Sequence, residues 1–217
     1  AGKSMPVLFA KTVGLRLESV MIDVLHAVDL GVGAHIVANV FWELVMAHTW
    51  ASCQDESVAI LTNLLAVWNS TNRVANRLQG KLTPQRLRTS GGWPKLKAKA
   101  AQVRATSRFA LVLAKQHDSG SQHDRQRLAI VQLLVRFYEL VEESDMVLSD
   151  ASIEEFKMIG HDLPLLYSAL ARGALASGVR CWKTQPTLHL FQHLCEWQVP
   201  MQLNPRFYWT YADEALV

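Results

Sequence analysis

The chain has 217 residues, half of them hydrophobic, which is enough to bury the core of one ordinary domain and argues against wholesale disorder. Its three cysteines are odd in number and far apart, which excludes a disulfide framework and makes a reducing, intracellular compartment the expected setting. The formal net charge of +3 is small, but no Asp or Glu occurs between Ser57 and His117, and this segregation favours a polyanionic partner.

The apolar residues between about 19 and 50 recur at helical spacing and predict one long helix or a broken pair, with Gly31 and Gly33 as the candidate position of a kink. Its most apolar stretch, Leu30 to Trp42, is 13 residues long. A helix that crosses a bilayer needs roughly 20 residues, so we expect a buried helix and no membrane partner. The first residues of the chain also lack the apolar run and cleavage pattern of a signal peptide.

Five further helices follow from the apolar periodicity and from capping residues such as Asp55. Their predicted ranges are about 56–78, 95–116, 124–146, 152–178 and 186–197. We expect Gly160 and Pro164 to break or bend the fourth of these helices, and the aromatic run 207–211 predicts a strand. The predicted fold class is therefore all-α, a multi-helix domain with at most one or two short strands near the C-terminus.

The acid-free part of the chain carries the predicted DNA-binding surface. In the basic stretch 73–115, lysines and arginines alternate with alanines after Pro94, so they can present a cationic stripe to phosphates. The candidate DNA-binding residues are Arg73, Arg77, Lys81, Arg86, Arg88, Lys95, Lys97, Lys99, Arg104 and Arg108. Trp93, in the loop before Pro94, is a candidate for stacking on an unpaired base or for docking the helix. In the alternative of a purely structural bundle, the acidic stretch 139–155 would cover this stripe.

Two pairs of residues have the spacing of metal ligands on one helix face. Asp23 and His26 lie three residues apart, and His189 and His193 lie four apart, so each pair can converge on one ion. Each spacing is also typical of histidines that make ordinary hydrogen bonds or face solvent. If folding joined the pairs, the four side chains would complete a tetrahedral set. The alternative is that the four side chains hydrogen-bond to one another without a metal and so fasten the two segments together.

Glu214 stands beside Asp213, directly after the aromatic run. A carboxylate just beyond a strand can bind a divalent cation together with acids of neighbouring strands, as in two-metal phosphodiester chemistry. An acid in the first turn of a helix is favoured by the helix dipole alone. The residues around Glu214 by themselves favour the second interpretation, an ordinary acid at the start of a helix.

Three segments, in this order, resemble the DDE-type (RNase-H-like) DNA transposases that carry an all-α insertion. Residues 21–32 are similar to the Asp-x-x-His motif of the CACTA and hAT types. Residues 183–193 resemble their Lys-x-His-x-x-x-His segment, although extra residues after Lys183 displace the first histidine. Residues 204–214 resemble the Gly-Pro…Trp-x-Tyr…Glu segment that bears the third catalytic carboxylate. The V(D)J recombinase catalytic subunit belongs to the same broader group.

The resemblance implies that the chain is a fragment of an enzyme for metal-dependent DNA strand cleavage and transfer. Residues 1–183 would form the helical insertion domain, and 184–217 would return to the RNase-H-like core with its strand and the start of a terminal helix. The first two catalytic acids are expected upstream of Ala1, so the fragment alone would be inactive and would contribute DNA binding and Glu214. The implied partners are DNA and, in the full-length protein, further copies of the same chain; the implied location is the nucleus.

The resemblance also implies Mg²⁺ or Mn²⁺ at the catalytic site and a structural Zn²⁺ at Asp23, His26, His189 and His193. Aspartate in place of cysteine at position 23 supplies a hard oxygen ligand where a thiolate would bind zinc more tightly. The alternative function is a non-enzymatic helical module that binds nucleic acid or a protein.

Overall fold

The structure, a computed structural model, describes residues 21–210. These residues form helices joined by loops, and none of them belongs to a strand; isolated bridges join Arg88 to Pro94 and Val147 to Leu203. The predicted all-α fold class is confirmed. In chain order the elements are η2 (Leu25–Gly33), α2 (Ala34–Met46), α3 (Gln54–Thr71), α4 (Pro84–Leu87), α5 (Ala100–Gln116), α6 (Gln122–Glu143), α7 (Asp150–Ala176), α8 (Pro186–His193), η3 (Leu194–Gln198), η4 (Val199–Met201) and η5 (Pro205–Phe207).

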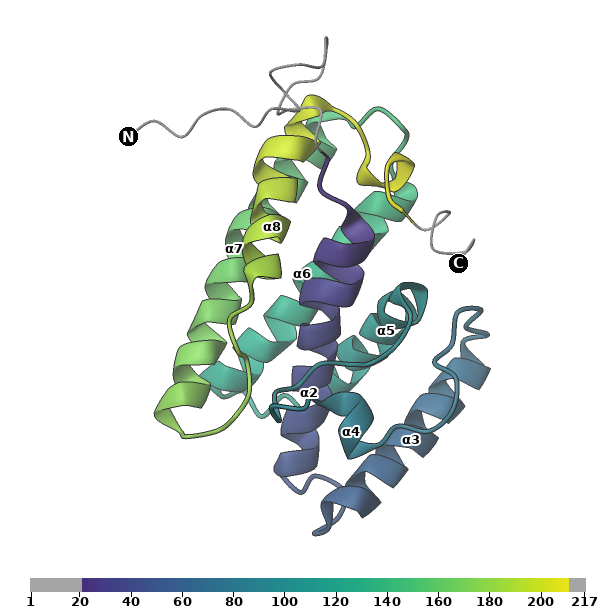
Figure 1. The fold of residues 1–217 in the computed structure, drawn as a ribbon, viewed down its shortest axis with the longest axis vertical. Helices are drawn as coiled ribbons and strands as arrows, with labels where there is room; N and C mark the ends of the chain where they lie inside the picture. Colours follow the sequence, from purple (N-terminus) through teal and green to yellow (C-terminus); the bar gives the residue numbers. More distant parts are fainter. Residues whose placement is uncertain (1–20, 211–217) are drawn as a thin grey trace.

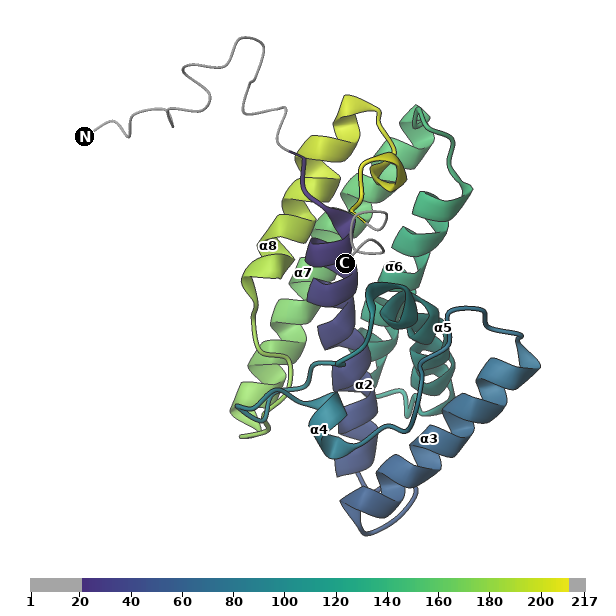
Figure 2. The ribbon, with the colours of Figure 1, turned by 45° about the vertical axis from the view of Figure 1, so that its right-hand side comes forward.

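The π-helical segment η2 continues directly into α2, and together they form the central helix of the bundle. Figures 1 and 2 show this helix with α7 and α8 on one side, α5 and α3 on the other, and α6 behind it. Every residue from Gly31 to Trp42 is buried, because neighbours cover this apolar helix all round. Within residues 21–210, the one helical stretch long and apolar enough to cross a membrane is Leu25–Met46, and most of it is buried inside the bundle.

The central helix is kinked at Gly31, as its sequence predicts. Gly31 has φ −97° and ψ −109°, outside the helical region. A Cβ atom there would lie 2.9 Å from Cβ of Thr187 in α8. At Gly33 a Cβ would lie 2.7 Å from the hydroxyl oxygen of Tyr138 in α6. The two glycines therefore let α8 and α6 approach the central helix more closely than any larger residue would allow.

The helix predicted over 95–116 begins only at Ala100, and this part of the prediction is wrong. The segment before it is not helical. Its sequence, Lys-Leu-Lys-Ala-Lys, alternates with a period of two, which suits an extended chain with one buried face. Leu96 is 1% exposed, and its backbone N donates to the carbonyl of Ala34 at 3.0 Å, in place of a bond within a helix.

Two other boundaries differ from prediction, and the break expected as one possibility in α7 does not form. Helix α3 ends at Thr71 rather than near residue 78, and Arg73 follows in the left-handed region with φ 52°. Helix α7 runs unbroken through Gly160 and Pro164. Over the described part of the predicted strand, 207–210, no strand forms. A 3₁₀ turn ends there instead, because Pro205 suits the first helical position and the Asn204 side chain accepts from the backbone N of Arg206.

The predicted division at 183/184 does not separate two cores among residues 21–210. Phe191 of α8 and Leu194 of η3 are fully buried in the same apolar cluster as the residues of α6 and α7. The ring of Phe191 meets that of Phe137 edge-on, with the centroids 5.2 Å apart. Residues 184–210 therefore pack as part of the helical bundle.

Candidate nucleic-acid interface

The basic loops between α3 and α5 are fastened together by Arg86 of α4. Its guanidinium donates to three backbone carbonyls, those of Gln79 (2.5 Å), Lys81 (3.2 Å) and Lys97 (3.1 Å). The backbone N of Lys97 returns a bond to the carbonyl of Arg86 at 2.9 Å. Arg86 is therefore occupied by the fold, and it places Lys81 and Lys97 on neighbouring stretches of chain.

Lys95, Lys97 and Lys99 alternate with Leu96 and Ala98 along the extended segment. Leu96 is buried, whereas Lys97 and Lys99 are exposed and Lys95 is half-buried. The period of two therefore turns the three lysines away from the core. The last of them is held at the start of α5, since the backbone N of Lys99 donates to the side chain of Gln102 at 3.2 Å.

Three other predicted DNA-binding residues are engaged within the fold. The guanidinium of Arg88 lies 4.1 Å from the ring centroid of the buried Trp42. Arg104, only 14% exposed, pairs with the fully buried Asp29 at 3.1 Å. Arg108 pairs with Glu142 at 3.1 Å. Arg86, Arg88 and Arg104 therefore serve the packing of the bundle, whereas Arg108 is matched by a carboxylate in an exposed ion pair.

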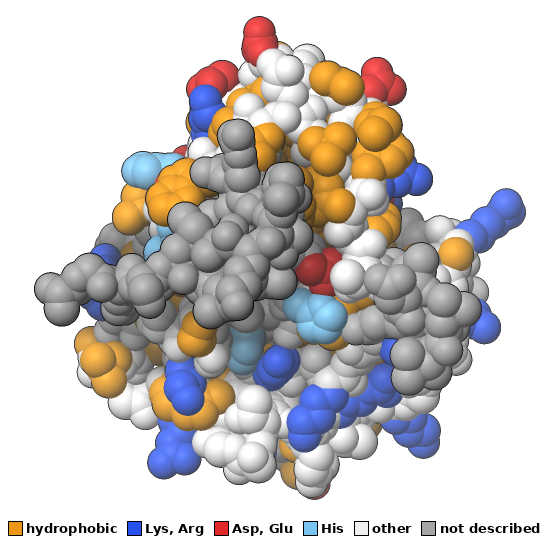
Figure 3. All heavy atoms as spheres, turned by 45° about the horizontal axis from the view of Figure 1, so that its top comes forward, with side chains coloured by type: hydrophobic (Ala, Val, Ile, Leu, Met, Phe, Trp, Pro, Cys, Tyr) orange, Lys and Arg blue, Asp and Glu red, His pale blue; other side chains and the backbone are white. Residues whose placement is uncertain are grey.

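The remaining six predicted residues keep their charge available. We call them the basic loop face: Arg73, Arg77, Lys81, Lys95, Lys97 and Lys99. Within residues 21–210 none of the six makes an ion pair, and no acid lies in the same part of the sequence. Figure 3 shows Lys and Arg gathered over the lower half of one face of the molecule, with most Asp and Glu toward its upper end.

Most of the acidic stretch 139–155 is paired elsewhere. Arg136 of α6 lies within 4 Å of Glu139, Glu143 and Glu155, and its closest contact, to Glu155, is 2.6 Å. Hydrogen bonding with Glu155 raises the pKa of Arg136. The contact between acids and the predicted stripe comes from Glu142, which reaches Arg104 and Arg108. The acidic stretch thus pairs with Arg104 and Arg108 of the predicted stripe and makes no ion pair with the basic loop face.

Asp23 and His26 form the close pair that their spacing predicts. Nδ1 of His26 lies 2.5 Å from Oδ2 of Asp23. The Asp23 carboxylate also accepts from the backbone N of Thr210 at 3.0 Å and from its hydroxyl at 2.8 Å. Burial by itself would raise the pKa of Asp23, but the hydrogen bonds from His26 and Thr210 outweigh it and leave this pKa below its usual value. The Asp23 carboxylate therefore joins the start of the described chain to Thr210 near its end.

His189 and His193 also lie together, with their Nε2 atoms 2.7 Å apart. The ring of His193 continues onto Trp197, with centroids 3.9 Å apart. Among residues 21–210, no group of three or more His, Cys, Asp or Glu side chains is arranged to hold a metal ion. The structure therefore forms the two predicted pairs separately and does not assemble them into a four-ligand site. Glu214 lies outside the described residues.

A buried polar cluster on the central helix is the feature that the sequence patterns do not reveal. The Glu43 carboxylate accepts from the indole N of Trp182 at 2.5 Å and lies 3.4 Å from Arg127. Its hydrogen bond to His123 raises the pKa of that histidine. One turn earlier, Asn39 accepts from the backbone N of Trp182 at 2.7 Å. The sequence does contain one signal of this cluster, since Asn39 and Glu43 are polar residues four positions apart in an otherwise apolar helix.

The chain matches no protein-family model, no curated protein and no solved structure.

Proposed function

We propose that this chain is a helical nucleic-acid-binding module that holds the phosphate backbone on its basic loop face. The observation that carries the proposal is the set of six cationic side chains without an ion pair among the described residues, on segments without acids. Cations that face solvent together bind a polyanion by releasing its counterions, without reading its sequence. A structural bundle would gain nothing from leaving so much like charge unmatched.

The geometry supports a continuous surface. Gln102 accepts from the backbone of Lys99 and donates to the carbonyl of Arg77 at 3.4 Å, which places these two basic residues around one amide. Arg86 does the same for Lys81 and Lys97. The cations thus sit on loops that hydrogen bonds fix in place, so that less order has to be gained on binding.

The test is the salt dependence of DNA binding by two variants with equal change in net charge. In the first, Lys97→Glu and Lys99→Glu alter the basic loop face. In the control, Lys115→Glu alters an exposed residue at the other end of α5, about 24 Å along the helix from Lys99, and Arg125→Glu alters an exposed residue near the start of α6. Fluorescence anisotropy with a labelled duplex gives the dissociation constant over a series of salt concentrations from about 50 to 200 mM.

We expect the first variant to bind more weakly and its salt slope to fall by about one unit for each phosphate that it no longer neutralises. The control should retain most of the affinity and the slope of the parent chain. Equal reductions in the two variants would mean that only net charge matters, and the proposal of a defined face would be wrong. An absence of binding by the parent chain would remove the function altogether.

We further propose, on the resemblance of residues 21–32, 183–193 and 204–214, that the module belongs to a DDE-type transposase. The contacts of Asp23 with Thr210 and of Ile22 with Gln198 support this, because they hold the start and the end of the described chain side by side. An inserted domain must leave and rejoin its parent core at neighbouring points. The same closeness is common among ordinary domains, so activity is the decisive measurement.

The transposase proposal predicts that the full-length protein cleaves its element ends with Mg²⁺ or Mn²⁺. Glu214→Gln should abolish cleavage and leave DNA affinity unchanged, since a missing metal ligand stops the chemistry without touching the basic loop face. Two upstream aspartates on strands must complete the site. Cleavage that persists in Glu214→Gln would overturn the assignment and leave the binding module standing.

A further inference from the structure

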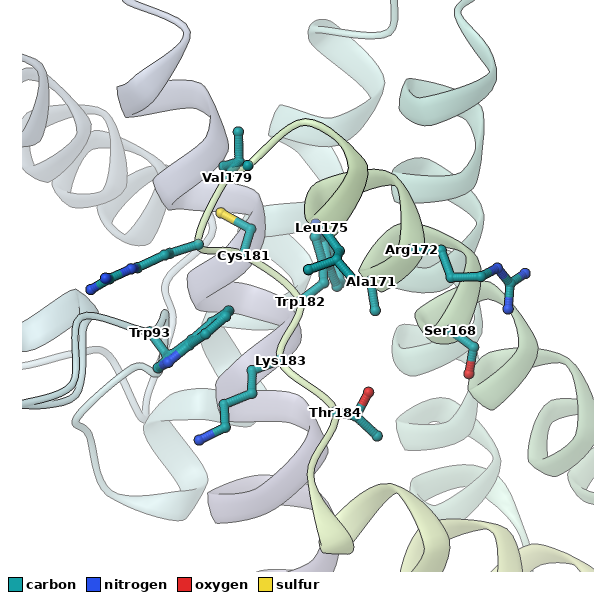
Figure 4. A pocket seen from close by; sticks show the side chains of 12 residues that line it. Trp93, Ser168, Ala171, Arg172, Leu175, Val179, Cys181, Trp182, Lys183 and Thr184 are labelled. Atoms are coloured by element: carbon teal, nitrogen blue, oxygen red, sulfur yellow. The ribbon is translucent and has the colours of Figure 1, made fainter.

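A pocket of about 530 Å³ lies between the end of α7 and the segment 178–184, with Trp93 as one wall (Figure 4). Its apolar lining includes Ala171, Leu175 and Val179. Three cationic residues, Arg172, Arg180 and Lys183, also line it, and no Asp or Glu among the described residues does. An apolar lining with cations beside it suits a flat apolar group that carries negative charge at its edge.

Trp93 is held at the mouth of this pocket by its loop. Its backbone N donates to the hydroxyl of Thr89 at 3.2 Å, and its carbonyl accepts from the backbone N of the same residue at 2.8 Å. The indole is half-exposed, and Nζ of Lys183 lies 5.7 Å from its ring centroid. Figure 4 shows Trp93 and Lys183 on the same side of the segment 180–184. A rigid aromatic surface with a cation beside it therefore faces solvent.

The opposite wall is fixed by the polar cluster of the central helix. Trp182 is fully buried and adopts the left-handed φ of 55°, a strained conformation for so large a residue. Its bonds to Asn39 and Glu43 hold it there, and the hydroxyl of Tyr167 donates to the carbonyl of Lys183 at 2.9 Å. Arg180 and Lys183 flank this anchored position, so their backbones are set before any ligand arrives.

The pocket adjoins the basic loop face through Pro94. Lys95, a member of that face, follows Pro94 directly, and Pro94 follows Trp93. Lys95 and Lys183 both lie close enough to His35 to lower its pKa electrostatically. A strand of nucleic acid that crosses the basic loop face would therefore meet the aromatic wall and then Lys183 and Arg180.

We infer that the pocket receives an unpaired base of single-stranded DNA, stacked against Trp93, with the flanking phosphates on Lys183 and Arg180. This inference rests on the proposed function and adds to it a preference for single strands. Every base has a face that can stack on an aromatic ring, so the contact needs no particular sequence. A duplex keeps its bases stacked on one another and can use only the cations.

The test compares three labelled oligonucleotides of equal length: a thymidine single strand, the same strand with abasic sites, and a duplex. Anisotropy with the full chain should show that the thymidine strand binds at least several-fold more tightly than the abasic strand. Trp93→Ala should weaken binding of the thymidine strand about tenfold, within the range expected for the removal of one stacked base. Binding of the abasic strand and the duplex should not change.

Trp93→Phe should retain most of the preference, because phenylalanine keeps a stacking face. Trp197→Ala is the matched control, an exposed tryptophan on η3 that is not part of the pocket lining. Thermal melts followed by circular dichroism must show that each variant is folded. If Trp93→Ala loses the preference and also melts early, Lys183→Gln with Arg180→Gln provides the second measurement and should lower affinity for the thymidine strand.

Equal affinity for thymidine and abasic strands, with the duplex still bound, would overturn the stacking site and leave the phosphate-binding function intact. Binding of none of the three would overturn both. A Trp93-dependent affinity for an acidic amphipathic peptide, without a preference for single strands, would assign the pocket to a protein partner and would also overturn the inference.

Discussion

Arg104 of α5 donates to the fully buried carboxylate of Asp29 at 3.1 Å, across 75 residues of sequence, and this pair ties α5 to the kinked part of the central helix. The same guanidinium lies 4.5 Å from the ring centroid of Trp209 and 5.2 Å from that of Tyr138. A residue that the sequence assigns to a DNA-facing stripe is thus turned inward, because a buried carboxylate requires a partner.

Asp29→Ala is therefore expected to destabilise the fold by about 3 kcal/mol, since it removes the closest carboxylate of the nearly buried Arg104 and leaves only the 3.8 Å contact with Glu142. Urea denaturation followed by circular dichroism measures the free energy of unfolding. Arg108→Ala is the control, because its pair with Glu142 is exposed and should contribute no more than about 1 kcal/mol. Similar destabilisation in the two variants would show that the burial of Asp29 has no energetic consequence.

Gly160 of α7 is expected to tolerate no side chain. A Cβ atom there would lie within overlapping distance, 2.4 Å, of Cβ of Cys195, which is fully buried in η3. Gly160→Ala should therefore destabilise the protein by about 1–3 kcal/mol through overpacking between α7 and η3. Thermal and urea unfolding provide the measurement.

Gly173 of the same helix offers the matched substitution. It is exposed, and a Cβ there would meet no atom of another element within 4 Å. Gly173→Ala should be neutral or stabilising by up to about 1 kcal/mol, because alanine favours the helix. Opposite signs at the two glycines are the predicted result, and a neutral Gly160→Ala would refute the close approach of α7 and η3.

Local sequence patterns account for most of the helices but not for their ends. Apolar periodicity identifies the central helix and α6, because the apolar residues of both recur at helical spacing. The alternation of Lys95 to Lys99 with Leu96 and Ala98 has a strand-like period of two, yet its alanine and lysine content favours a helix. The extended form is stabilised by the hydrogen bond from the backbone N of Leu96 to the carbonyl of Ala34. Ala34 lies 62 residues earlier in the chain, so the local sequence does not indicate this contact.

The candidate interface could be predicted only in part for the same reason. Charge segregation along the sequence predicts ten candidate DNA-binding residues, and six of them make no ion pair among the described residues. The other four find partners within the fold, and for three of them the partner is distant in sequence: Asp29 for Arg104, Trp42 for Arg88 and Glu142 for Arg108. Spacing alone predicts the Asp23–His26 and His189–His193 pairs, since the members of each are three or four residues apart and both pairs depend on local helical geometry, the first at the start of η2 and the second within α8. Their mutual placement depends on the whole fold.

Asn204 closes the C-terminal end of α6 and is expected to be indispensable there. It is fully buried, and its amide N lies 3.0 to 3.2 Å from the carbonyls of Val141, Ser144 and Asp145. Asn204→Ala leaves these carbonyls without their donor and should destabilise the protein by about 1–3 kcal/mol. Asn204→Asp should destabilise it further, because a carboxylate would face the same carbonyls.

Asn63 is the control for this prediction. It is exposed in the middle of α3, and Asn63→Ala should change the free energy of unfolding by less than about 0.5 kcal/mol. Chemical denaturation at constant pH separates the three variants. If Asn204→Asp proved as stable as the parent chain, the carbonyl-capping role would be wrong.

His35 predicts a decline of stability in mild acid. Burial lowers its pKa to about 4, although the hydrogen bond with the Pro94 carbonyl opposes this shift, and the charges of Lys95 and Lys183 lower the pKa further. The unfolded chain, with a histidine pKa near 6.5, therefore takes up a proton between pH 6.5 and 4 that the folded chain refuses. The contribution of neutral His35 is complete above about pH 6.5 and falls by about 3 kcal/mol as the pH drops to about 4.

Urea denaturation between about pH 4 and 7.5 measures this linkage, and the comparison is with His35→Gln, which can still donate to the carbonyl of Pro94 but cannot titrate. The variant should show a flatter dependence of stability on pH than the parent chain across this window. His123 works in the opposite sense, because its pKa is raised by Glu43 and its contribution is lost as the pH rises. His123→Gln should therefore steepen the decline toward acid, and parallel pH profiles for the parent chain and His35→Gln would show that His35 is not buried in its neutral form.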